Sequence, residues 1–166
     1  MNAEDILKYG HLTLMATIDG LEEKDCEMGG VCGIWSVKQI IAHLTSHELI
    51  MVDVLNSLIG SDRPTPNLSI YESQGVAFND VEVDKRKGFS YAETVREYKA
   101  ASAQVRHLIG QIPPEKRRQA GTLPWYGHEY DLEDFIVYSS YGHKREHSAQ
   151  INVYRDQLKA QAKLFG

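Results

Sequence analysis

Apolar residues recur at alternating steps of three and four along four long stretches of the chain. The first stretch carries the pattern through Leu7, His11, Leu14, Ile18 and Leu21. The last carries it through Ile136, Ser140, His143, His147, Ile151, Tyr154 and Leu158. Because an α-helix has about 3.6 residues per turn, this spacing places the apolar residues on one face. The pattern predicts helices over residues 3–24, 36–59, 90–112 and 132–164.

Local signals mark the ends of these helices. Ser36-x-x-Gln39 and Ser90-x-x-Glu93 are capping boxes, in which two side chains satisfy backbone N–H groups at a helix start. Pro113-Pro114 stops the third helix, because proline cannot continue it. Strand signals are confined to short runs such as Val81-Glu-Val83. The sequence therefore predicts one all-α domain over residues 1–166, an antiparallel four-helix bundle with a long connection between the second and third helices.

The connections are uneven in length. Roughly 30 residues separate the second helix from the third, far more than a usual connection, which indicates either a crossover over one end of the bundle or a functional lid. The last connection, Thr122–Asp131, carries Trp125, Tyr126 and His128. Both segments could wall a pocket at one end of the bundle. Packing is the alternative, because aromatic residues in loops often plug a core.

Composition narrows the classes of partner. The chain has 18 basic and 23 acidic residues and a net charge of −5, which argues against a nucleic-acid or anionic-membrane surface. No stretch approaches the roughly 18 apolar residues needed to span a bilayer, and the start has acidic residues where a secretory signal is basic. We therefore expect a cytoplasmic protein. Cys26 and Cys32 form no metal-binding pattern, and two reduced thiols are expected rather than a local disulfide.

The histidines carry the candidate chemistry. His43 and His47 are four residues apart on the second predicted helix, as are His143 and His147 on the fourth. Each pair lies on the apolar stripe of its helix, so the rings are predicted to point inward. A buried imidazole needs a partner for its ring nitrogens, which a neighbouring side chain or a metal ion can provide. Three inward histidines from two helices at one level of a bundle favour the metal.

These histidines and their neighbours in the sequence resemble the motifs of the DinB/YfiT-like superfamily. The resemblance rests on Trp35 near the start of a helix, His43 eight residues later, and His143-x-x-x-His147 followed by Gln150-Ile151. It implies a four-helix bundle in which His43, His143 and His147 bind a divalent metal ion, Zn²⁺ or Ni²⁺ most often. His47 has no fixed counterpart in the motif. It is expected either beside the ligands or in the core, and the same holds for His11.

The resemblance also implies a function. Relatives are similar to transferases that use a low-molecular-weight thiol, or to metal-dependent hydrolases. We therefore expect a metal-dependent enzyme that acts on a small electrophilic or amide-containing metabolite or xenobiotic, with a thiol as a possible cosubstrate. His47, Glu48 and His128 are the candidates for proton transfer. The alternatives are a non-enzymatic stress or sequestration protein that binds a small molecule, and a homodimer whose histidines are structural.

Overall fold

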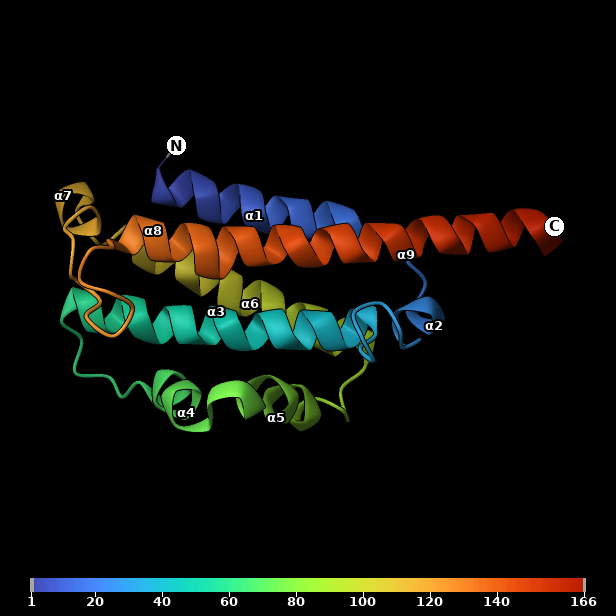
Figure 1. The fold of residues 1–166 in the computed structure, drawn as a ribbon, viewed down its shortest axis with the longest axis horizontal. Coiled ribbons are helices and arrows are strands. Elements are labelled where there is room, and N and C mark those ends of the chain that lie inside the picture. The colour runs from blue at the N-terminus through green and yellow to red at the C-terminus, as the bar shows by residue number, and fades with distance from the viewer. Residues whose placement is uncertain (1, 166) are drawn as a thin grey trace.

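A computed structural model describes residues 2–165 of the chain, and over this range the protein is all-helical (Figure 1). The long helices are α1 (Ala3–Ile18), α3 (Val37–Ile59), α6 (Tyr91–Ile109) and α9 (His143–Phe165). The shorter helical elements are α2 (Glu23–Cys26), α4 (Pro66–Gln74), η1 (Gly75–Ala77), α5 (Phe78–Lys85), α7 (Pro114–Arg117), α8 (Leu132–Ile136) and the π-helical segment η2 (Val137–Gly142). The expected all-α class is confirmed.

The predicted helix starts are confirmed by their caps. At α3 the backbone N–H of Ser36 donates to Oε1 of Gln39 at 2.9 Å, and the Ser36 hydroxyl accepts from the Gln39 backbone at 3.2 Å. Ser90 and Glu93 make the same pair of bonds at α6. Each cap satisfies N–H groups that have no partner within the helix.

One predicted helix is interrupted and another contains an irregular turn. The stretch 3–24 is not one helix, because α1 ends at Ile18 and Gly20 takes a left-handed φ of 71° before α2 begins. The stretch 132–164 is helical throughout, as predicted, with the π-helical turn of η2 between α8 and α9. The third predicted helix ends earlier than expected, at Ile109, and Ile112 follows it as a buried turn residue.

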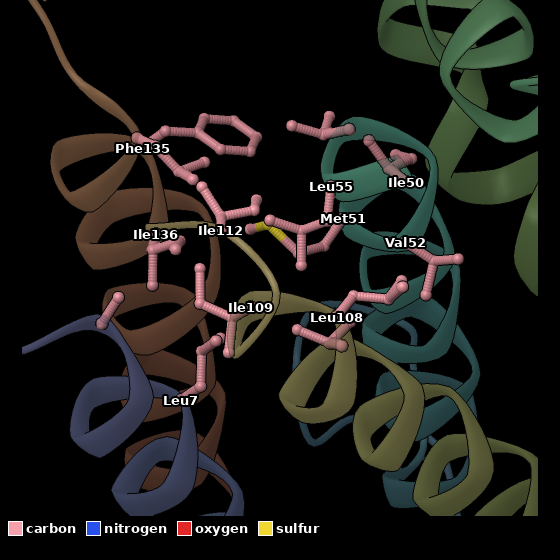
Figure 2. Packing of buried hydrophobic residues seen from close by; sticks show 14 of the residues in the cluster. Leu7, Ile50, Met51, Val52, Leu55, Leu108, Ile109, Ile112, Phe135 and Ile136 are labelled. Carbon is pink, nitrogen blue, oxygen red and sulfur yellow. The ribbon is translucent and has the colours of Figure 1, made fainter. Parts of the chain in front are cut away.

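Two buried apolar clusters give the directions of the long helices. The first joins the start of α1 and α8 to the ends of α3 and α6, and includes Leu7, Met51, Ile109 and Ile136 (Figure 2). The second joins the end of α1 and the body of α9 to the starts of α3 and α6. Thus α3 and α6 run in the same direction, opposite to α1 and α9. This differs from the expected antiparallel bundle in the shared direction of α3 and α6.

The long connection between α3 and α6 explains that direction. It carries α4, η1 and α5 back along the side of α3, so that α6 begins at the same end as α3 (Figure 1). We call residues 61–90 the crossover. Two helices that run the same way need such a return path, which is why the connection is long. The described helices include none that is both long and apolar enough to cross a membrane.

A buried arginine fixes the crossover to the long helices. The guanidinium of Arg86 donates two hydrogen bonds to the Glu97 carboxylate on α6, at 2.7 and 3.0 Å, and a third to the Ser46 hydroxyl on α3 at 3.0 Å. It also contacts the carboxylate of Glu82 at 3.3 Å. Arg86 is only 6% exposed, whereas the Glu97 carboxylate is partly exposed, so the guanidinium binds its partners from a buried position.

Replacing Arg86 with alanine should lower the free energy of unfolding by about 1.5–3 kcal/mol, because its hydrogen bonds to Glu97 and Ser46 are lost, whereas Glu82 keeps its ion pair with Lys85. Lys87→Ala, at an exposed neighbour, is the matched control and should change it by less than about 0.5 kcal/mol. Urea denaturation followed by circular dichroism measures both. Equal stabilities for the two variants would show that the Arg86 contacts do not hold the crossover.

Candidate metal centre

Four histidine rings meet between α3 and α9. His43 and His47 are one turn apart on α3, and His143 and His147 are one turn apart at the start of α9. The Nε2 atom of His143 lies 2.7 Å from Nε2 of His43 and 3.1 Å from Nε2 of His147. A ring nitrogen from each of His43, His47 and His143 lies within 4.8 Å of the others. The predicted inward direction of the histidines is confirmed.

The rings of His143 and His147 also have hydrogen-bond partners outside the cluster, and these partners bear on which ring nitrogen carries the proton. Nδ1 of His147 lies 2.8 Å from the amide oxygen of Gln150, and the imidazole of His143 donates to the backbone carbonyl of Ser139. A proton on Nδ1 of His147, donated to Gln150, leaves the Nε2 lone pair of that ring for the cluster. The Nε2 atoms of His143 and His147 lie at the facing edges of the two rings.

His43 is the most deeply placed ring. It is 3% exposed, packs against the indole of Trp35 with ring centres 4.9 Å apart, and its Nδ1 has no hydrogen-bond partner among the described residues. The resemblance placed Trp35 and His43 in one motif, and the contact between their rings gives that spacing a physical meaning. The indole closes the site on one side and keeps water from His43.

The crossover closes the site on another side. Nε2 of His47 lies 3.3 Å from the amide oxygen of Asn79, and the His47 ring meets the rings of Phe78 and Tyr71 edge-on. His47 thus belongs to the histidine cluster, which is one of the two positions that we expected for it. Asn79 was not predicted from the sequence, because nothing in its local pattern distinguishes it from other polar residues of a connection.

Burial keeps these histidines uncharged. Burial, with smaller contributions from the neighbouring imidazoles, lowers the pKa of His43 to about 2 and that of His143 to about 3. The pKa values of His47 and His147 are also lowered, again chiefly by burial, while their bonds to Asn79 and Gln150 oppose the shift. The cluster is a set of neutral nitrogen donors at neutral pH.

The π-helical segment η2 directly precedes His143. Such wider turns are rare in proteins, and those that occur are often found at functional sites. Here the segment includes Ser139, whose backbone is a hydrogen-bond partner of the His143 ring. Gly142 suits this turn, because a Cβ atom there would lie 3.2 Å from the Val137 carbonyl oxygen.

A cavity of about 430 Å³ opens beside the histidines. His47 and His143 form part of its wall, with Tyr71 from the crossover and Trp125 from the last connection. The remaining lining residues are Ile50, Met51, Phe135, Tyr138, Ser139, Gly142 and Glu146. One aromatic residue of each of these two connections therefore lines a pocket, which is one of the two alternatives that the sequence left open for them.

The other proton-transfer candidates lie elsewhere. Glu48 is 2% exposed and forms an ion pair with Lys144, which is 1% exposed and also donates to the Ser140 hydroxyl at 2.6 Å. His128 is exposed on the last connection and is not among the cavity-lining residues. His11 packs on Tyr98, with ring centres 5.7 Å apart, and does not line the cavity. Of the three candidates, the structure places only His47 with the metal cluster and the cavity.

Comparisons of the chain with protein-family models, with curated proteins and with solved structures found no match. What the chain does must therefore be inferred from its residues and their geometry.

Both cysteines are free thiols, as expected, and neither lies in the cluster.

The buried Glu48–Lys144 pair joins α3 to α9 beside the histidines. Either Glu48→Ala or Lys144→Ala should destabilise the protein by about 3–5 kcal/mol, because each leaves one buried charge alone. The double variant Glu48→Leu/Lys144→Met should recover most of that loss, since no charge is then buried. Urea unfolding of the three variants measures this. A double variant as unstable as the singles would contradict a structural role for the pair.

The lowered pKa values predict an acid-sensitive fold in the metal-free protein. Between pH 7 and 5 an unfolded histidine gains a proton near its ordinary pKa of 6.5, whereas folded His43 and His143 stay neutral. Stability is therefore greatest above pH 6.5 and falls as the pH drops, by about 2 kcal/mol for each of these histidines at pH 5.

Urea unfolding of chelator-treated protein at a series of pH values tests this expectation. His107→Gln and His128→Gln, at exposed positions, are the control variants and should keep the same dependence. Carboxylates titrate mostly below pH 5, so the window isolates the histidines. An unchanged free energy of unfolding between pH 7 and 5 would rule out neutral buried rings.

Proposed function

We propose that the four-histidine cluster binds a divalent transition-metal ion, with His43, His143 and His147 as ligands. One observation carries the proposal: Nε2 of His143 lies 3.1 Å from Nε2 of His147 and 2.7 Å from Nε2 of His43. Neutral imidazole nitrogens that converge in this way can be ligands of one cation. Nitrogens about 2.0–2.1 Å from one tetrahedral ion lie roughly 3.3 Å apart, so small shifts of the rings would admit the ion.

The donor set and its surroundings fit a metal of the zinc or nickel type. Imidazole nitrogen suits Zn²⁺, Ni²⁺, Cu²⁺ and Fe²⁺, and the choice among them depends on supply as well as on affinity. The bonds from His147 to Gln150 and from His143 to Ser139 are the outer contacts that orient metal-ligating histidines. When bound by three neutral imidazoles, such an ion supplies Lewis acidity, which polarises a carbonyl group or makes water more acidic.

The remaining residues suit a reaction in the cavity. His143 and His47 place the cluster at the cavity wall, so a molecule held there would lie against the site. His47 is neutral, contacts the cavity and is fixed by Asn79, which makes it the best-placed group to accept or return a proton. The aromatic and aliphatic walls would exclude water from the bound molecule.

We propose an enzyme of the metal-dependent hydrolase kind, in a bundle of the DinB/YfiT-like type. The order of Trp35, His43, His143, His147 and Gln150 supports the family, and the long crossover between α3 and α6 supports the fold. The cavity lining includes no Lys or Arg side chain, which favours hydrolysis of an uncharged group over transfer from a carboxylate-bearing thiol.

A non-enzymatic binding protein is the second candidate. The observation in its favour is the cavity itself, whose apolar lining could retain a small molecule without any reaction. Metal content separates the two candidates, because a sequestration pocket needs no ion. Thermal-shift measurements with and without added metal and thiols would show which ligand stabilises the protein.

His143→Ala should abolish metal binding while the helical circular dichroism stays close to that of the unchanged protein. The variant removes the nitrogen shared by both short contacts and truncates a half-buried ring. Elemental analysis after incubation with Zn²⁺ or Ni²⁺ and gel filtration gives the metal stoichiometry. His128→Ala is the control and should bind as much metal as the unchanged chain. Equal metal content in the two variants would refute the site.

A further inference from the structure

The cavity beside the histidines has a distinct chemical character. Besides the histidines, four of its lining residues are aromatic and come from three parts of the chain: Tyr71, Trp125, and the helical pair Phe135 and Tyr138. Trp125 and Phe135 meet edge to face, with ring centres 5.4 Å apart. The faces of such rings carry a partial negative charge, which attracts cations.

The rings at the cavity are only partly covered by the protein. Tyr138 is 68% exposed and Trp125 is 42% exposed, although both are large apolar side chains. Exposed aromatic residues around a cavity are typical of a binding site, because a ligand can cover the surface that the chain leaves open. The ligand expected here has an apolar body.

The single charged residue of the lining is Glu146. It lies on α9 one turn after His143, is exposed, and makes no ion pair with any residue in the described range 2–165. The two neighbouring cations are engaged elsewhere. Lys144 pairs with buried Glu48, and the guanidinium of Arg145 lies over the ring of Tyr141, 5.6 Å from its centre. The Glu146 carboxylate is therefore available to a bound molecule.

From the aromatic walls and this carboxylate we propose that the cavity binds small organic cations, namely amines with an aromatic or alkyl body. The ammonium group would lie at Glu146 and the ring faces, with the body against Ile50, Met51 and Phe135. Organic anions of the same shape would be disfavoured, since the carboxylate repels them. That the bound amine is a substrate rests on the proposed function, whereas the binding preference itself does not.

Three ligands with the same body test the proposal: phenylbutylamine, phenylbutanol and phenylbutyrate. Isothermal titration at pH 7 on chelator-treated protein avoids direct coordination of the carboxylate or amine by a metal ion. The amine should bind about tenfold more tightly than the alcohol, and the carboxylate should bind least. Equal affinities, tighter binding of the carboxylate, or no binding of the three would overturn the proposal.

Two variants test whether the Glu146 carboxylate causes the preference for the amine. Glu146→Gln keeps the shape of the side chain and removes its charge, and should bring the affinity for the amine to that for the alcohol. Asp156→Asn removes one charge from the same helix outside the cavity, and should leave the preference unchanged. An amine preference that survives Glu146→Gln would also overturn the proposal. Zinc stoichiometry of the same variants after incubation with Zn²⁺ and gel filtration reports separately on the metal centre, so failure of one proposal is distinguishable from failure of the other.

Discussion

The convergence of neutral imidazole nitrogens is the constraint on which this structure depends. Burial holds His43 and His143 uncharged, and a bond to Gln150 orients the His147 ring, so that ring nitrogens converge on a common point. Three of these rings, those of His43, His47 and His143, lie close enough together to hold a metal ion. The neighbouring elements surround the rings. Trp35 covers the cluster on one side and the crossover covers it on another, and the π-helical turn supplies a carbonyl acceptor for His143. Each of these features is explained by the need to hold the rings in place.

Buried ion pairs keep the elements that carry the site together. Glu48 and Lys144 each follow a cluster histidine in the chain, so their contact inside the core links α3 and α9 at the level of the rings. Arg86 links the crossover, and thereby Asn79 and Tyr71, to both α3 and α6. Buried charges contribute little net stability when paired, but they make alternative arrangements costly because separation leaves a charge alone. They define the geometry of the site more than its stability.

Helices and inward histidines could be predicted from the sequence because both depend on local spacing. Caps at Ser36 and Ser90 and the apolar stripes locate the helices, and His43 and His143 share those stripes. The break at Gly20 and the π-helical turn were missed, since apolar spacing continues across both. Glu48 could not be placed, because a charged residue is ordinarily exposed and its partner lies 96 positions away, at Lys144. The shared direction of α3 and α6 was missed because stripes carry no information about how helices are ordered.

The π-helical turn also sets the rotation of α8 relative to α9. A wider turn holds one residue more than a regular one, and each residue of an α-helix accounts for about 100° of rotation. Phe135 and Ile136 can therefore face the apolar core while His143 and His147 face α3. Deleting a single residue from 137–142 would straighten the helix and turn one of these two faces away from its partners. With the extra residue, one continuous helix directs its apolar residues toward the core and its histidines toward α3. A regular α-helix of the same length could not place both sets in these directions.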